Sequence, residues 1–235
     1  MRVHGIGPST SAGLTKIIKM SRQRSKLPLL LGALAGLLAL AGGLWASNSL
    51  FTPAGLNTDE LHGTYLDGGR EITRFNLIDH NGQPFTRAAL EGQWTLLFFG
   101  FTNCPDVCPM TMLELGQVQS RLTDKGVTEP VQGVFVTVDP QRDTPEHLKA
   151  YVTAFNQDFV GVTGALDDID VLARDLGIVH VRHGEADDED YMVDHGSALL
   201  LVNPEGRLQA LFQAPHRSAT ISADLERILA HHGRG

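Results

Sequence analysis

The sequence contains only two cysteines, Cys104 and Cys108, among its 235 residues. A small secreted domain that depends on disulfides for stability uses several cysteine pairs, usually far apart in the chain. One pair four positions apart restricts the unfolded chain very little, so a disulfide here would add little stability. We therefore expect the two thiols to serve a chemical purpose, with a structural disulfide as the weaker alternative.

Basic residues are scarce after residue 26, and acidic residues are absent before it. The first 26 residues hold six lysines and arginines, and the remaining chain holds the other 13 against all 27 acidic residues, a net charge of −14. A domain of that charge repels nucleic-acid phosphates, which argues against a nucleic-acid-binding role. Its partner is instead expected to be a cation, a basic protein surface, or both.

Only one apolar run is long: residues 27–45 read LPLLLGALAGLLALAGGLW, without a charge. A helix of this length can cross a hydrocarbon core of about 30 Å. The basic residues 1–26 are expected to stay on the cytoplasmic side as a tail, which places the rest of the chain across the membrane. A cleaved signal peptide is the alternative to this transmembrane anchor. Residues 46–69 lack periodicity and are predicted to be a linker, followed by one domain over residues 70–235.

Strand and helix patterns alternate along the predicted domain. Uninterrupted apolar runs indicate strands buried on both faces, and apolar stripes at helical spacing indicate helices. The expected strands are Trp94–Gly100, Val131–Val138, Ala198–Val202 and Leu208–Phe212, and the expected helices are Pro109–Leu122, Ser218–His231 and two that begin near Thr144 and Asp168. This order predicts an α/β domain with a mixed sheet and helices on both faces.

Both cysteines lie in the segment Phe99–Pro109 (FGFTNCPDVCP), between a predicted buried strand and a predicted helix. Proline inside a helix removes a hydrogen bond and clashes with the preceding turn, so Pro109 is expected at the first helical position. That position places Cys108 at the helix cap and Cys104 in the loop before it. The partial positive charge of a helix N-terminus favours thiolate, the form that binds metals and attacks disulfides.

Three residues separate the two cysteines, one more than in a typical thiol–disulfide oxidoreductase. The wider spacing leaves room for the sulfurs to spread around a metal ion, although it does not forbid a disulfide. Asp106 adds a negative charge between the thiols, which a bound cation would offset. Two soft sulfur ligands suit Cu(I) and also zinc, and either metal needs a third ligand that this segment does not identify.

Three segments, in order, resemble the Sco (SenC) family of membrane-anchored copper proteins. The cysteine segment resembles the copper-site segment of that family, Val138–Pro145 (VDPQRDTP) resembles its VDPxRDTP stretch, and Tyr191–Ser197 (YMVDHGS) resembles its YxVDHS segment. The resemblance covers about residues 70–235 and the anchor. Asn103 and Gly196 depart from the residues that are frequent in the family, but neither departure removes a ligand.

The resemblance implies a thioredoxin-like (peroxiredoxin-like) fold and a copper ion, Cu(I) or Cu(II), bound by Cys104, Cys108 and His195. Without it, His195 is one of ten histidines with little to distinguish it. The implied function is delivery of copper to the copper-bearing subunit of cytochrome c oxidase during assembly. Other copper chaperones and thiol–disulfide reductants are the further partners that the resemblance allows.

The basic leader lacks a long presequence rich in arginine and serine, which favours a bacterial inner membrane. The chain would cross this membrane once, with its domain in the periplasm. The mitochondrial inner membrane, with the domain facing the intermembrane space, is the alternative.

A thiol–disulfide reductase is the competing hypothesis. Cys104 and Cys108 would then form a redox pair that keeps the copper-binding cysteines of the oxidase reduced, without a need for His195. A peroxidase is disfavoured, because no arginine is adjacent to either cysteine to activate a thiolate.

Other residues with metal-binding side chains are given simpler roles. Asp139 and Asp143 are expected to be turn and cap residues, and His180 and His183 are expected on the surface. The acidic run 185–190 lacks the alternating ligands and glycine of a calcium loop, so we interpret it as a solvated loop that could guide a cation or a basic partner.

Overall fold

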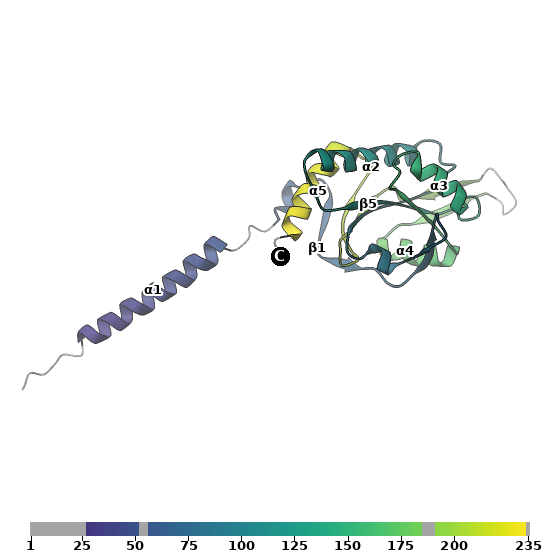
Figure 1. The fold of residues 1–235 in the computed structure, drawn as a ribbon. Coiled ribbons are helices and arrows are strands. Elements are labelled where there is room, and N and C mark those ends of the chain that lie inside the picture. The colour runs from purple at the N-terminus through teal and green to yellow at the C-terminus, as the bar shows by residue number, and fades with distance from the viewer. Residues whose placement is uncertain (1–26, 52–55, 185–190, 234–235) are drawn as a thin grey trace, which may run out of the picture. The chain divides into compact units, whose positions relative to one another are not determined.

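The computed structural model describes residues 27–51, 56–184 and 191–233, and it describes the side chains of the first helix from residue 31 to residue 45. The chain divides into two compact units with a boundary between residues 53 and 54. The first unit contains α1 (Leu27–Phe51), which includes the run predicted to span a membrane (Figure 1). Within the residues described, no helix is both long enough and apolar enough to cross a bilayer.

The second unit is built on an eight-stranded sheet with the strand order β1-β10-β9-β4-β5-β6-β2-β3. Its strands are β1 (Thr64–Glu71), β2 (Asn76–Asp79), β3 (Pro84–Thr86), β4 (Trp94–Gly100), β5 (Val131–Thr137), β6 (Val160–Thr163), β9 (Leu199–Val202) and β10 (Arg207–Phe212). The central strands β4, β5 and β6 are parallel, and the other pairs are antiparallel. A separate antiparallel hairpin consists of β7 (His180–His183) and β8 (Met192–His195). The predicted mixed sheet is confirmed.

Helices cover both faces of this sheet, because successive side chains of the buried strands point to opposite sides. Leu96 and Phe98 of β4 pack in one apolar core with α2, α3 and α5, whereas Leu97 and Phe99 pack in a second core with α4. The helices are α2 (Val107–Asp124), α3 (Pro145–Thr153), α4 (Leu166–Leu176) and α5 (Ser218–His232), with short 3-10 helices at Thr58–Glu60 and Arg87–Leu90. Figure 1 shows α2 and α5 on one side of the sheet and α4 on the other.

The structure differs from the sequence-based expectation before residue 70. The stretch predicted to be a linker, 46–69, includes the end of α1 and most of β1. Strand β1 pairs with β10, but its register shifts between Tyr65 and Arg70, where Gly68 and Gly69 adopt positive φ angles of 71° and 65°. Two glycines at a bulge interrupt the alternation that marks a strand, which is why the pattern did not predict it.

Candidate metal centre

The loop that carries the two cysteines begins where β4 ends, at Gly100. A Cβ atom at Gly100 would lie 2.9 Å from the Cys108 sulfur and 2.8 Å from the Phe135 ring. Cys108 is fully buried against this glycine, whereas Cys104 is half-buried in the loop. The absence of a side chain at Gly100 therefore creates the space that the Cys108 sulfur fills.

The N-terminus of α2 differs from the prediction. The helix begins at Val107 rather than Pro109, so Cys108 is its second residue and Pro109 its third. The first four N–H groups of a helix have no partner within the helix, and a proline in the first turn therefore costs no hydrogen bond. Cys108 belongs to the first turn rather than to the cap.

His195 reaches the cysteines from the end of β8, 87 residues further along the chain. Its Nε2 atom lies 3.4 Å from the Cys108 sulfur. The potential ligand atoms of Cys104, Cys108 and His195 all lie within 4.8 Å of one another, the sole grouping of this kind among the residues described. The structure thus brings together the three side chains that the sequence analysis named.

The orientation of the His195 ring is fixed from three sides. Its Nδ1 atom lies 3.2 Å from the carbonyl oxygen of Gly196, and because a carbonyl can only accept, Nδ1 donates. This leaves the lone pair of Nε2 directed at the sulfur. Phe98 and Phe101 contact the ring edge-on, with ring centroids 5.8 and 6.0 Å away. Such a tautomer, with one nitrogen donating and the other free, is the one that ligates metals.

Burial disfavours charge on Cys108 and on His195 in the absence of a cation. Desolvation raises the pKa of the Cys108 thiol far above its ordinary value, and a hydrogen bond involving the Phe101 backbone offsets only part of this shift. Desolvation also lowers the pKa of the His195 imidazole. The expectation that the helix N-terminus makes Cys108 a thiolate is therefore wrong, because burial outweighs the helix charge. A metal ion would have to displace the thiol proton on binding.

Two sulfurs and one imidazole nitrogen form a donor set that suits copper and also zinc. Cys104 and His195 are both half-buried and offer access to the centre from solvent, while Cys108 is fully buried. Asp139 and Asp143 are not part of the group, and their carboxylates are buried and hydrogen-bonded to other residues.

The remaining predictions about nearby residues have mixed outcomes. The imidazole of His180 is largely buried, with Nε2 2.8 Å from an Asp170 carboxylate oxygen, so its predicted surface position is wrong. His183 is exposed, as predicted, and lies 2.6 Å from Asp194. The acidic run 185–190 falls outside the residues described. The sequence analysis missed the contacts that Gly100, Phe98 and Phe101 make with the centre. No local sequence pattern indicates which residues from distant parts of the chain come into contact.

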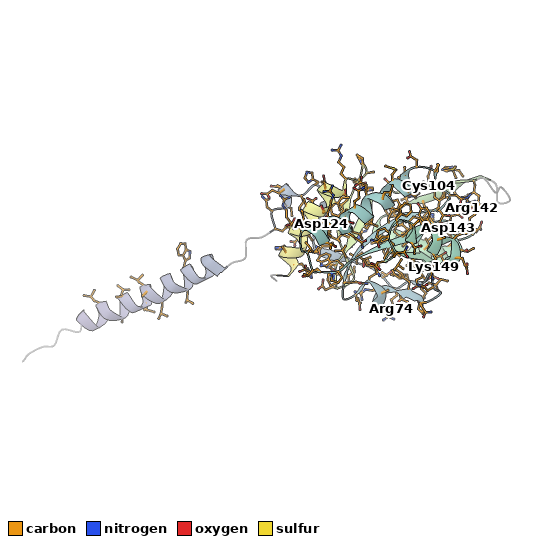
Figure 2. The ribbon with its side chains drawn as sticks, turned by 45° about the horizontal axis from the view of Figure 1, so that its top comes forward. Arg74, Cys104, Asp124, Arg142, Asp143 and Lys149 are labelled. Carbon is orange, nitrogen blue, oxygen red and sulfur yellow. The ribbon has the colours of Figure 1, made fainter. Side chains whose placement is uncertain are left out.

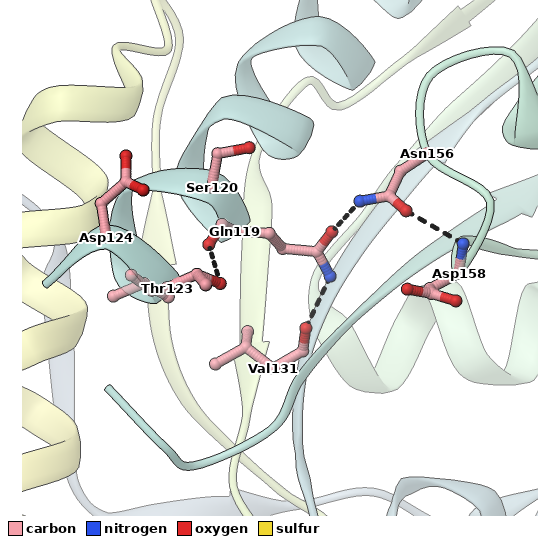
Figure 3. A pocket seen from close by; sticks show the side chains of 8 residues that line it. Gln119, Ser120, Thr123, Asp124, Val131, Asn156 and Asp158 are labelled. Carbon is pink, nitrogen blue, oxygen red and sulfur yellow. Dashed lines mark hydrogen bonds between the residues drawn. The ribbon is translucent and has the colours of Figure 1, made fainter. Parts of the chain in front are cut away.

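A polar pocket elsewhere on the domain does not compete with this centre. It has a volume of about 410 Å³ and lies at the Val131 end of β5, opposite the end near the cysteine loop (Figure 3). Gln119 donates to the Val131 carbonyl and accepts from Asn156, both at 2.7 Å, and Asn156 accepts from the Asp158 backbone at 2.9 Å. These polar groups satisfy one another, and no thiol or imidazole is among the side chains that line the pocket.

Comparison with known proteins places the chain among copper proteins of one family. The model of the SCO1/SenC family matches residues 64–230. The mitochondrial SCO2 homolog of Bos taurus is 36% identical over 156 residues, covering 66% of this chain and 59% of that protein. The chain thus spans about three fifths of the length of this relative.

Two solved structures share the fold. A crystal structure of Arabidopsis thaliana ScoI with copper bound superposes with a TM-score of 0.63 at 31% identity, covering 67% of this chain and 98% of that one. A crystal structure of yeast Sco1 with copper bound gives a TM-score of 0.63 at 30% identity, covering 70% of this chain and 89% of that one.

Proposed function

Because the chain belongs to the SCO1/SenC family, we propose that it binds one copper ion through Cys104, Cys108 and His195. The observation that carries this proposal is the convergence of two sulfurs and one imidazole nitrogen within 4.8 Å. The chain would deliver the copper to the copper-bearing subunit of cytochrome c oxidase and so assist its assembly. Copper is then the cargo of the protein rather than a resident cofactor.

The geometry of the centre suits transfer. Cys104 and His195 are half-buried, whereas Cys108 is fully buried, and Phe98 and Phe101 contact the His195 ring edge-on. An incoming ligand of the recipient would therefore first replace Cys104 or His195, and the fully buried Cys108 would be replaced last. Stepwise replacement avoids a free copper ion at any stage.

The test is a copper titration of the full chain, purified in detergent under reducing conditions. We expect one copper per chain, and we expect His195→Ala to weaken Cu(II) binding more than Cu(I) binding, because two thiolates alone satisfy Cu(I) better than Cu(II). His183→Ala is the matched control, since His183 lies in the same hairpin but pairs with Asp194 on its exposed side. Unchanged Cu(II) affinity in His195→Ala would remove this residue from the centre.

A thiol–disulfide reductase is the second candidate, favoured by the two free thiols in one loop. In that reaction Cys104 and Cys108 would form a disulfide, and their two electrons and two protons would reduce a disulfide of the recipient to two thiols. This activity does not need His195. Full oxidase assembly in cells that carry only the His195→Ala chain would favour the reductase, whereas failure of assembly would favour copper delivery.

We also propose that residues 27–45 anchor the chain in a bacterial inner membrane, with the copper domain in the periplasm; a mitochondrial inner membrane is the alternative. The support is the uncharged apolar sequence and the basic residues before it. Partners at that surface would include copper donors or thiol reductants as well as the oxidase. Protease added to intact spheroplasts should digest the domain, and recovery of an intact domain would contradict this orientation.

A further inference from the structure

The end of β5 and the segment that follows it connect the cysteine loop with the histidine hairpin. Thr137, the last residue of β5, together with Asp139 and Asp143 forms a group that we call the brace, and all three residues are buried. The sequence analysis gave both aspartates turn and cap roles. The structure shows hydrogen bonds from the brace to each of the two chain segments that supply the ligands.

On the cysteine side, Asp143 holds the loop through Thr102, two residues before Cys104. The Thr102 backbone N–H donates to Asp143 at 3.0 Å, and the Thr102 hydroxyl donates at 2.5 Å. The Thr137 hydroxyl donates to the same carboxylate at 2.6 Å. Figure 2 shows Cys104 and Asp143 at the same end of the domain. This completely buried carboxylate therefore fixes the start of the cysteine loop.

On the histidine side, Asp139 holds the β7–β8 hairpin through Tyr191, four residues before His195. The Tyr191 hydroxyl donates to one carboxylate oxygen of Asp139, and Arg142 Nε donates to the other at 2.5 Å. The Tyr191 ring is stacked between two guanidinium groups, with the Cζ atoms of Arg142 and Arg182 each 3.6 Å from its centroid. Hydroxyl and ring are thus both held in place.

The two sides are connected within the brace. The Asp139 backbone N–H donates to the Thr137 hydroxyl oxygen at 2.9 Å, and that hydroxyl in turn donates to Asp143. An unbroken series of hydrogen bonds therefore runs from Thr102 to Tyr191. The hydroxyls of Thr102 and Tyr191 each donate one hydrogen bond, and the hydroxyl of Thr137 donates one and accepts one. The carboxylates of Asp139 and Asp143 only accept, as an ionised carboxylate must.

We propose that Asp139 and Asp143 are positioning residues of the metal centre. Asp143 sets the position of the cysteine loop, and Asp139 sets the position of the histidine hairpin, so the brace determines the separation between sulfur and imidazole. This inference rests on the proposed copper site. The hydrogen bonds of the two aspartates go to neighbours of the metal ligands rather than to the ligands themselves, Asp143 acting through Thr102 and Asp139 through Tyr191.

The histidine side is tested with Tyr191→Phe in the full chain, which removes the hydroxyl and keeps the ring between the guanidinium groups. We expect Cu(II) affinity to fall about tenfold or more, as for the loss of other outer-shell partners, while Cu(I) affinity changes less than about twofold. The sulfur-to-Cu(II) charge-transfer absorption should also shift. Tyr65→Phe, which removes a hydroxyl on β1, is the matched control and should leave both affinities unchanged.

The cysteine side is tested with Thr102→Val and Thr102→Ser. Valine has no hydroxyl to donate to Asp143, and we expect affinity for Cu(I) and Cu(II) to fall together by about tenfold. Serine keeps the hydroxyl and should restore both affinities. Equal affinities in the two variants would overturn this half of the proposal.

The outcomes separate this inference from the proposed function. If the wild-type chain binds no copper, the proposed function fails, and the positioning roles fail with it. The wild-type chain could instead bind copper while Tyr191→Phe has the same copper affinities as wild type, or loses affinity for Cu(I) and Cu(II) equally. In either case only the positioning role of Asp139 fails.

Discussion

Gly100 is the single residue whose size decides whether the Cys108 sulfur fits. An added methyl group would lie 2.9 Å from that sulfur and 2.8 Å from the Phe135 ring. We expect Gly100→Ala to lower copper affinity at least about tenfold by displacing the sulfur. Overpacking of this kind also costs roughly 1–3 kcal/mol of folding free energy. Copper titration and urea unfolding of the apo chain measure the two effects.

Gly116→Ala in α2 is the control for this substitution. A Cβ atom there would meet its nearest neighbour, the Phe155 carbonyl oxygen, at an ordinary 3.5 Å. Because alanine is the better helix former, stability should stay the same or rise by about 0.5–1 kcal/mol, with unchanged copper affinity. If Gly100→Ala likewise leaves stability and copper affinity unchanged, the space at Gly100 does not determine the position of the Cys108 sulfur.

Single residues also show where reasoning from the sequence ended. Cys104 and Cys108 were identifiable from their local segment, and His195 only from a resemblance. The prediction that Cys108 is a thiolate was wrong. Burial, a tertiary property, raises the pKa of its thiol by more than the helix N-terminus, which the sequence indicates, can lower it. The roles of Asp143 and Asp139 depend on partners 41 and 52 residues away, respectively, which no spacing rule reports.

Among the elements, the junction of β2 with β6 depends on one imidazole. The Gly161 backbone N–H donates to His80 Nδ1 at 2.9 Å, and the His80 backbone N–H donates to the Gly161 carbonyl at 2.8 Å. A protonated imidazole could not accept the first bond. Burial lowers the pKa of His80, and the nearby Lys149 charge adds to this effect, while Asp79 opposes it.

The sign of the resulting pH dependence follows from this lowered pKa. Above about pH 6.5 the imidazole is neutral in both folded and unfolded chains, so its contribution to stability is complete. As the pH falls below that value the unfolded chain takes up the proton first, and the contribution is lost. We expect urea unfolding of His80→Asn to show a smaller loss of stability between pH 7 and pH 5.5 than wild type. An equal loss would contradict this assignment.

The elements that the sequence predicted best are those with a strong local pattern. The buried strands β4 and β5 are uninterrupted apolar runs, and α3 begins at a capping Thr144 followed by Pro145. Strand β1 lacked such a pattern, since its pairing with β10 depends on a partner more than 130 residues away. The start of α2 was misplaced by two residues because proline is tolerated throughout the first helical turn.

At the scale of the whole molecule, the domain begins earlier than residue 70. The completely buried carboxylate of Asp224 on α5 accepts from the backbone N–H groups of His62 and Gly63, at 2.7 and 2.9 Å. Leu56 and Leu61 pack against the core of the same face. His62 and Gly63, which the sequence analysis assigned to a linker, thus donate hydrogen bonds to a buried carboxylate. A chain without them would leave the Asp224 carboxylate without these two donors.

Two truncated chains test this boundary. A chain that begins at residue 54 keeps both donors to Asp224 and all of β1, so its urea unfolding should match that of the same domain in the full chain. A chain that begins at residue 70 lacks these donors and most of β1. We expect it to be less stable than the chain that begins at residue 54 by about 3 kcal/mol or more, because the buried Asp224 carboxylate loses hydrogen-bond donors. Asp224→Ala, which removes the acceptor, should destabilise the longer chain far more than the shorter one, since only the longer chain has those bonds to lose. Equal effects in both would mean that packing of β1 alone defines the start of the domain.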